Sequence, residues 1–99
     1  MAVHEQAPEL AACFGRNLWL LRRRAEYSQE DLSVRAALHR TEIGLLENGK
    51  RMPRLDTIIQ LAGAMEKEPG DLLVGMAWTP EGHKQGRFYV VGGPKRRSG

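Results

Sequence analysis

Apolar residues recur at helical spacing over the first three quarters of the chain. Spacings of four, three and four residues form one stripe of an amphipathic helix, and its members are Phe14, Leu18, Leu21 and Ala25. Similar spacings recur further along, at Ile43 and Leu46, and then at Ile58, Leu61, Ala62 and Met65. These patterns predict that the apolar faces of several helices form one core.

Start and stop signals divide the middle of the chain into two short helices. Ser28 followed by Asp31 is typical of a helix N-terminus, because the serine caps the helix and the acid suits its dipole. We expect this helix to run to about Arg35 and a second helix to cover residues 39–47 after a tight turn. Gly49 ends the second helix, since glycine readily takes a left-handed conformation. Two short helices joined so tightly have helix-turn-helix geometry.

The last quarter of the chain has a different pattern. Pro69 predicts the start of a fifth, short helix. Residues 78–86 are rich in turn formers, and residues 87–91 are the one convincing strand candidate. A lone strand cannot satisfy its own backbone groups, so this strand has to pair with another segment.

These signals divide the chain into three segments. We expect a flexible N-terminus over residues 1–9 and a helix-turn-helix domain over residues 10–77. A C-terminal extension follows over residues 78–99, and its basic end, residues 95–99, is expected to be disordered.

Composition and charge narrow the class of protein. A hydrophobic fraction of 41% suits one modest core, and no apolar run is long enough to span a membrane. The single cysteine cannot form an internal disulfide, so a reducing cytoplasm is the expected location. The net charge is +3, and the bases concentrate between Arg22 and Arg54, where they suit a polyanion.

Patterns of catalytic or metal-binding residues are not evident in the sequence. The histidines at positions 4, 39 and 83 are scattered, and Cys13 has no paired base. Neither paired carboxylates nor a glycine-rich phosphate loop occurs. We therefore expect neither an enzyme nor a bound metal or other cofactor.

The motifs between residues 13 and 74 resemble those of the phage-repressor family, the Cro and xenobiotic-response-element type of helix-turn-helix domain. They are Phe14-Gly15, Leu21-Arg22, Ser28-Gln29-Glu30-Asp31-Leu32, Ile43-Gly44-Leu45-Leu46-Glu47-Asn48-Gly49, Lys50-Arg51-Met52-Pro53, Leu61-Ala62 and Leu72-Leu73. The resemblance implies an all-α, five-helix, lambda-repressor-like domain, to which this chain adds a short C-terminal β-strand or hairpin. It also implies a bacterial, cytoplasmic regulator of transcription, associated with the nucleoid when bound, that binds double-stranded DNA as a homodimer.

The resemblance assigns contacts to DNA by motif position. Residues expected to contact bases are Arg40, Thr41, Glu42, Leu45 and Gln29. Arg40 suits O6 and N7 of guanine, and Glu42 suits N4 of cytosine, although an acid there repels phosphate. For Glu42 and Leu45, the absence of any base contact is an equal alternative.

Other motif positions imply contacts to the DNA phosphates or a structural role within the protein. The residues expected to contact phosphates are Asn48, Lys50, Arg51 and His39. Arg22 and Glu47 match a structural ion pair that joins the first and third helices.

Three positions depart from the family pattern. Ala37 replaces the glycine of the turn, so its backbone has to avoid positive φ or accept strain. His39 replaces a capping serine or threonine, and when protonated it would strengthen DNA binding at low pH. Ser33 replaces an alanine, and its hydroxyl can bond back to the helix. These departures leave the operator sequence open.

Apolar residues also exceed the family pattern outside the five helices. They are Trp78, Phe88, Tyr89, Val90 and Val91. One option is a hairpin with the residues around Trp78, folded back onto the domain, in which case helices four and five would form any dimer contact. The other option, which we favour, pairs the strand with that of a second copy, so that these five residues form a two-fold dimer interface.

An alternative function keeps the fold and changes the partner. In it, the domain is a protein-interaction module or an antitoxin-type partner protein whose third helix is buried against another protein. Control by an antagonist protein also remains open. The cluster of Arg40, Gln29, Lys50 and Arg51 suits phosphates better than a protein groove.

Overall fold

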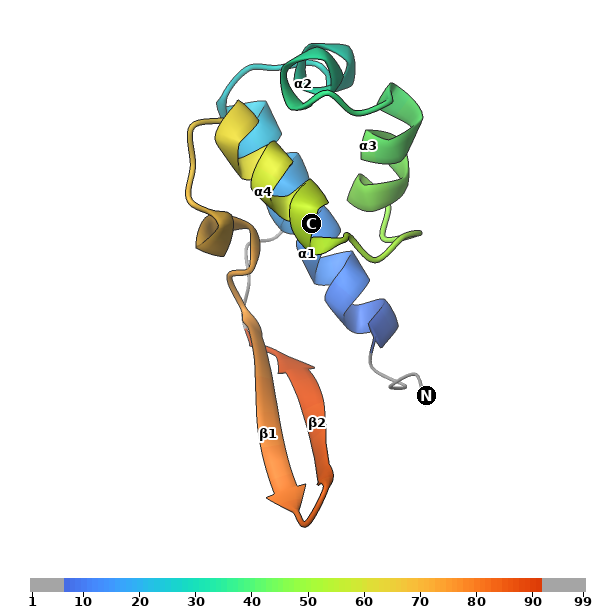
Figure 1. Ribbon diagram of the computed structural model, residues 1–99, viewed down its shortest axis with the longest axis vertical. Helices are drawn as coiled ribbons and strands as arrows, with labels where there is room; N and C mark the ends of the chain where they lie inside the picture. Colours follow the sequence, from blue (N-terminus) through green and yellow to red (C-terminus); the bar gives the residue numbers. More distant parts are fainter. Residues whose placement is uncertain (1–6, 92–99) are drawn as a thin grey trace, which may run out of the picture.

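The computed structural model describes residues 7–91, in which four α-helices and a 3-10 turn precede a two-stranded hairpin (Figure 1). The elements are α1 (Ala7–Arg24), α2 (Gln29–Ala36), α3 (Arg40–Glu47), α4 (Leu55–Ala64), η1 (Pro69–Leu72), β1 (Met76–Gly82) and β2 (Gln85–Val90). We expected a flexible N-terminus over residues 1–9, but α1 begins at Ala7, so residues 7–9 are helical. The remainder of that segment, and the basic end at residues 95–99, lie outside the described residues.

The predicted fifth helix is wrong. Pro69 does begin a helical segment, but it is a single 3-10 turn of four residues. Its anchor is Leu72, which is fully buried, and Gly75 with a φ of 91° redirects the chain shortly afterwards into β1. A start signal of this kind sets where a turn begins and not how far a helix continues.

The two short helices begin and end largely as predicted. Ser28 caps α2: its Oγ accepts from the Asp31 backbone N–H at 2.9 Å, and the Asp31 carboxylate accepts from the Ser28 N–H at 2.9 Å. The turn to α3 takes Ala37 through φ 59° and ψ 43°, so the alanine accepts the left-handed conformation usually left to glycine. His39 stands at the N-cap of α3 and makes no side-chain capping bond.

The core lies where α1, α2, α3, α4 and η1 meet. Its fully buried side chains are Leu18, Leu32, Ile43, Leu46, Leu61 and Leu72, with Phe14 at 1% exposure. The helices α1 and α3 approach very closely at Gly15, where an added Cβ would lie 2.5 Å from the carbonyl oxygens of Leu46 and Glu47. Only glycine therefore allows α3 to rest directly on the backbone of α1.

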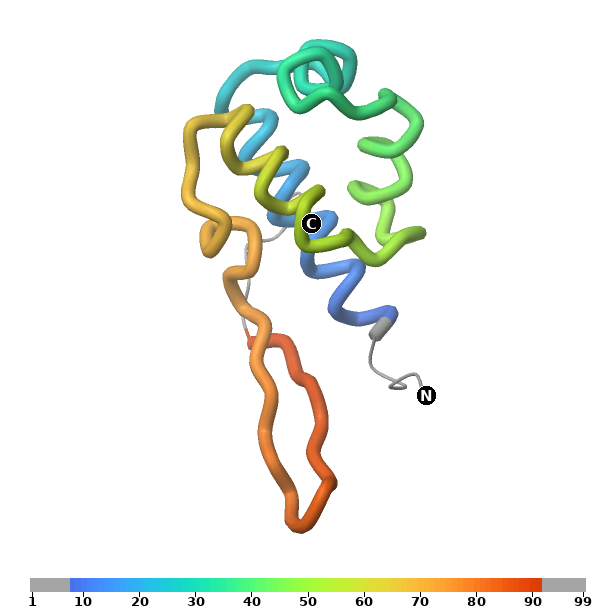
Figure 2. Tube along the Cα trace, viewed as in Figure 1, coloured from blue at the N-terminus to red at the C-terminus, as the bar shows by residue number. Residues whose placement is uncertain are grey.

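The hairpin resolves the pairing of the C-terminal strand. β2 pairs antiparallel with β1, with Trp78 opposite Phe88, so the strand pairs within its own chain and not with a second copy as we favoured. The two rings meet edge to face, with their centroids 4.9 Å apart. The base of the hairpin contacts α1, and its tip extends away from the helices, at the end of the molecule opposite α2 and α3 (Figure 2).

Candidate nucleic-acid interface

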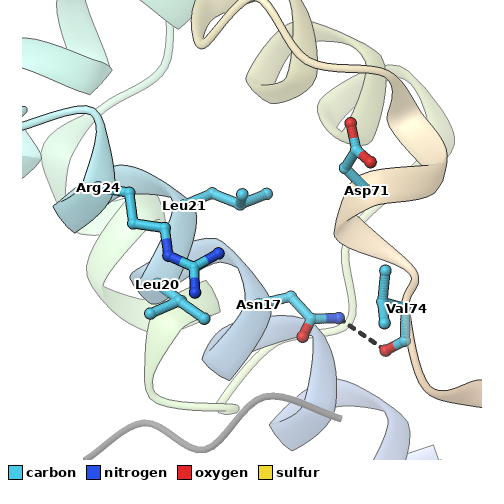
Figure 3. A pocket seen from close by; sticks show the side chains of 6 residues that line it. All are labelled: Asn17, Leu20, Leu21, Arg24, Asp71 and Val74. Atoms are coloured by element: carbon cyan, nitrogen blue, oxygen red, sulfur yellow. Dashed lines mark hydrogen bonds between the residues drawn. The ribbon is translucent and has the colours of Figure 1, made fainter.

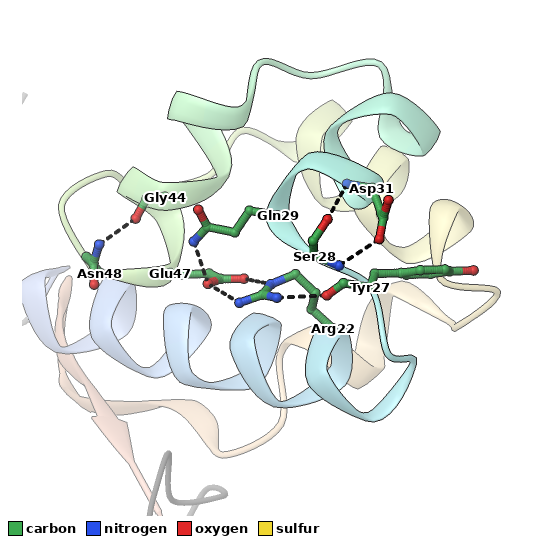
Figure 4. Close-up of polar contacts among 8 residues, drawn as sticks. All are labelled: Arg22, Tyr27, Ser28, Gln29, Asp31, Gly44, Glu47 and Asn48. Carbon is green, nitrogen blue, oxygen red and sulfur yellow. Dashed lines mark hydrogen bonds and ion pairs between the residues drawn. The ribbon is translucent and has the colours of Figure 1, made fainter.

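A buried polar network joins α1 to the helix-turn-helix unit (Figure 4). Arg22 donates from Nε to Oε2 of Glu47 at 2.5 Å and from Nη2 to Oε1 at 3.0 Å. Its Nη1 donates to the Tyr27 carbonyl at 2.8 Å, and Gln29 donates from Nε2 to Glu47 Oε1 at 3.0 Å. Arg22 and Glu47 are 8% and 2% exposed, so the pair expected between these two helices is desolvated and bidentate. The network fixes α3 and the first residue of α2 in one arrangement.

The N-terminal turn of α3 presents polar side chains to solvent. Arg40 and Thr41 are both exposed, as a residue that reads bases has to be. Arg40 Nε lies 3.7 Å from Glu30 Oε1, and both of these side chains are more than 60% exposed. This surface pair is weak, so the Arg40 guanidinium can leave it for another acceptor.

Gln29 and Leu45 flank this surface. Leu45 is partly exposed on α3. Oε1 of Gln29 lies 3.9 Å from where a Cβ on Gly44 would stand, so the amide of α2 lies over the middle of α3. With its Nε2 given to Glu47, Gln29 keeps the carboxamide oxygen for other donors.

Two residues expected to contact DNA separately are instead paired with each other. Nη1 of Arg51, in the loop after α3, donates to Oε1 of Glu42 in the first turn of α3. The Glu42 side chain is 24% exposed and the Arg51 side chain 50% exposed.

The remaining predicted phosphate contacts lie at both ends of α3. Asn48 donates from its side chain to the Gly44 carbonyl at 2.9 Å, which closes the C-terminus of the helix. Lys50 is exposed beyond it, and His39 is exposed at the other end.

The capping box at α2 also has an electrostatic consequence. Hydrogen bonds from the backbone N–H and the hydroxyl of Ser28 lower the pKa of Asp31 below its ordinary value of 3.8. The carboxylate is therefore held in its charged form at the start of α2.

Asn17 is a structural residue that the sequence analysis missed. It is 2% exposed, and its Nδ2 donates to the carbonyls of Leu72 and Val74, both at 2.9 Å. These bonds hold η1 and the start of the hairpin against α1. An asparagine inside an apolar stripe, four residues after Cys13, was the available signal.

A cavity of about 310 Å³ lies beside Asn17, between α1 and the segment after η1 (Figure 3). Leu20, Leu21 and Val74 form its apolar lining, while Arg24 and Asp71 stand at separate edges. Oδ1 of Asn17 is buried and has no hydrogen-bond partner.

The residues expected at a dimer interface are divided between the two faces of the hairpin. Trp78, Phe88 and Val90 share one face, because Phe88 lies opposite Trp78 and Val90 follows two residues later. Tyr89 and Val91 lie on the other face and are 37% and 57% exposed. Val91 donates its N–H to Gly75 at 2.7 Å, which closes the base of the hairpin.

The family model of helix-turn-helix domains matches residues 20–72. The chain belongs to the helix-turn-helix family, of the Cro and C1 type. As a member of this family, it is a DNA-binding regulator of transcription. The match covers the C-terminal end of α1 and all of α2, α3, α4 and η1. It therefore contains every residue of the exposed surface around α3.

Two solved structures resemble this helix-turn-helix protein. The restriction-modification controller protein C.AhdI from Aeromonas hydrophila is 37% identical, with a TM-score of 0.62, and the alignment covers 63% of this chain and 94% of that one. The hypothetical transcription factor NHTF from Neisseria is 27% identical, with a TM-score of 0.64, over 75% of this chain and 85% of that one. No curated protein matches the chain. No helix within residues 7–91 has the length and apolarity that a membrane crossing requires.

Proposed function

We propose that this regulator binds a symmetric operator in double-stranded DNA as a homodimer, with α3 in the major groove. The observation that supports this most is the exposure of Arg40 and Thr41 on a helix whose opposite side is fixed by the buried pair of Arg22 and Glu47. A helix that docks in the groove with its N-terminal residues at the base edges needs one face exposed to DNA and the opposite face held rigidly against the domain.

Base recognition would rest mainly on Arg40. Its guanidinium can grip O6 and N7 of guanine through two parallel bonds, and Thr41 can donate to a base or touch a thymine methyl. The Gln29 oxygen and the Leu45 side chain flank these two residues and complete the reading surface.

Register on the duplex would come from phosphate contacts around α3. Lys50 and Asn48 lie at its C-terminal end and His39 at its N-terminal end. Such contacts position the protein and carry no sequence information.

A selection of binding sites from random duplexes tests the recognition role. For Arg40→Ala, we expect a loss of about 1–3 kcal/mol on the preferred site and a relaxed preference at one base pair in each half-site. Arg54→Ala is the matched control, since it removes the same charge from an exposed residue that is also paired with an acid, Asp56, but outside α3 and the hairpin. An unchanged consensus in Arg40→Ala contradicts the placement of α3.

The homodimer would use the apolar residues of the hairpin. A two-stranded hairpin is marginally stable alone, and Trp78, Tyr89 and Val91 remain 37–57% exposed on it. A two-fold contact through the face that carries Tyr89 and Val91 would cover these two side chains while leaving both α3 helices free. Sedimentation equilibrium on a chain truncated after Ala77 tests this, with circular dichroism to check that the helices persist. Undiminished dimerisation of the truncated chain excludes the hairpin as the interface.

A further inference from the structure

The recognition helix carries an acid that already has a partner in the absence of DNA. Glu42 lies in the first turn of α3, one residue after Thr41, and its carboxylate accepts from the guanidinium of Arg51. Arg51 lies nine residues later, in the loop that leads to α4. Both side chains are partly exposed, so this ion pair is weak and can be exchanged for other partners at little cost.

An unpaired carboxylate is unfavourable in most positions of the major groove. It repels the phosphates, and it also meets the acceptors O6 and N7 of guanine or O4 of thymine. Cytosine differs because its own major-groove edge presents a donor, the N4 amine, and no acceptor. Among the bases, cytosine is therefore the one best suited to replace Arg51 as the partner of Glu42.

The charge of Arg51 is available to DNA only when Glu42 has another partner. A basic side chain that neutralises a phosphate releases condensed counterions. Each such contact changes the slope of the logarithm of the binding constant against the logarithm of the salt concentration by about 0.9. While Glu42 holds Arg51, the charge of the guanidinium is already compensated, so the pair as a whole releases few counterions.

We propose that Glu42 and Arg51 exchange partners on the correct operator and stay paired on other sequences. Where cytosine faces α3, its amine binds Glu42, and Arg51 is released to contact a phosphate. On other sequences Arg51 remains paired with Glu42, and that phosphate contact is not made. One base pair thus controls a phosphate contact that by itself carries no sequence information. This inference rests on the proposed docking of α3 in the major groove.

The first step of the test locates the base pair that faces Glu42. Site selection is carried out with the full-length wild type and with Glu42→Gln. We expect the two consensus sequences to differ at one base pair per half-site, where the wild type selects cytosine and the variant loses about tenfold in discrimination. A consensus that is the same for both proteins overturns the proposal.

The second step measures the salt dependence of binding to two duplexes, the selected operator and the same operator with those base pairs reversed. For the wild type, we expect the slope on the reversed duplex to be smaller by about 0.9 per protomer. For Glu42→Gln, the two slopes should be equal and as steep as that of the wild type on the operator. For Arg51→Gln, they should be equal and shallow.

Two matched variants separate this effect from a general change of charge. Glu30→Gln removes an acid on the neighbouring helix but leaves the pair of Glu42 and Arg51 intact, so the difference between the slopes should persist. Lys50→Gln removes a nearby phosphate contact and should lower both slopes equally. A wild type with equal slopes on both duplexes, or a difference that survives in Glu42→Gln, refutes the exchange while leaving the docking of α3 in place. A selection that returns no preferred sequence contradicts the docking and the exchange together.

Discussion

Replacing Arg22 with methionine removes one partner of the buried ion pair that joins α1 to α3. The variant loses both bonds to Glu47, at 2.5 and 3.0 Å, and the bond to the Tyr27 carbonyl at 2.8 Å. Glu47 is 2% exposed and would keep only the bond from Gln29. A buried charge left without its partner costs about 3–5 kcal/mol.

This cost is a large fraction of the free energy of unfolding of a small domain, which is about 5–15 kcal/mol. We expect Arg22→Met to lower Tm by at least about 12 °C. The double variant Arg22→Met/Glu47→Leu has no buried charge left to compensate. It should recover most of the loss or exceed the wild type, because apolar residues of similar volume often replace a buried pair without cost.

Urea denaturation of the wild type, Glu47→Leu, Arg22→Met and the double variant forms a double-mutant cycle. The expected coupling is several kcal/mol, since each single variant leaves a buried charge and the double leaves none. Gln29 loses its acceptor in the double variant, so we expect weaker DNA binding from a protein that is as stable as the wild type. Additive losses in the cycle would show that the network does not act as the structure indicates.

Three further perturbations concern the core, the helix crossing and the cap. Leu46→Ala should lower the free energy of unfolding by about 2–5 kcal/mol, because it opens a cavity beneath α3; an unchanged Tm contradicts that burial. Gly15→Ala should lower the free energy of unfolding by about 1–3 kcal/mol, because the added methyl meets backbone oxygens on α3. Gly63→Ala is the control: an added Cβ there has no neighbour within 4 Å, so the variant should stabilise α4 by about 0.5–1 kcal/mol. Urea denaturation compares the two variants, and equal effects would exclude the close crossing. The lowered pKa of Asp31 means that its charged form stabilises the fold above pH 3.8 and that this contribution is lost as the pH falls through the folded-state pKa. The Tm of Asp31→Asn should therefore lie below that of the wild type at neutral pH and approach it in acid, and a constant gap would disprove the linkage.

The helices were predictable because their signals are local. The stripe containing Leu18, the cap at Ser28 and the stop at Gly49 each act within one or two helical turns, and the structure follows them. The fifth helix was not predictable from Pro69, since an α-helix and a single 3-10 turn begin with the same residues. A hairpin with the residues around Trp78 was one of two options and not the favoured one, because Pro80 reads as a turn, although an edge strand tolerates a proline without its N–H.

The candidate interface was predictable in its residues and less so in their partners. The bidentate pair of Arg22 and Glu47 came from motif position, and the structure contains it. The contact between Glu42 and Arg51 depends on how the loop after α3 turns back, and no local pattern encodes that path. Sequence reasoning therefore gave these two residues separate roles that the structure joins.

The close crossing at Gly15 affects whether the protein or the DNA changes shape when they bind. Because the C-terminal end of α3 packs directly against the backbone of α1 at Gly15, α3 has little freedom to tilt or slide. In the proposed complex, the fit between helix and groove would then come from the duplex, through changes of groove width, twist or bend. The energy of such changes depends on the flexibility of each base step, so operators would differ in affinity at positions that no side chain touches.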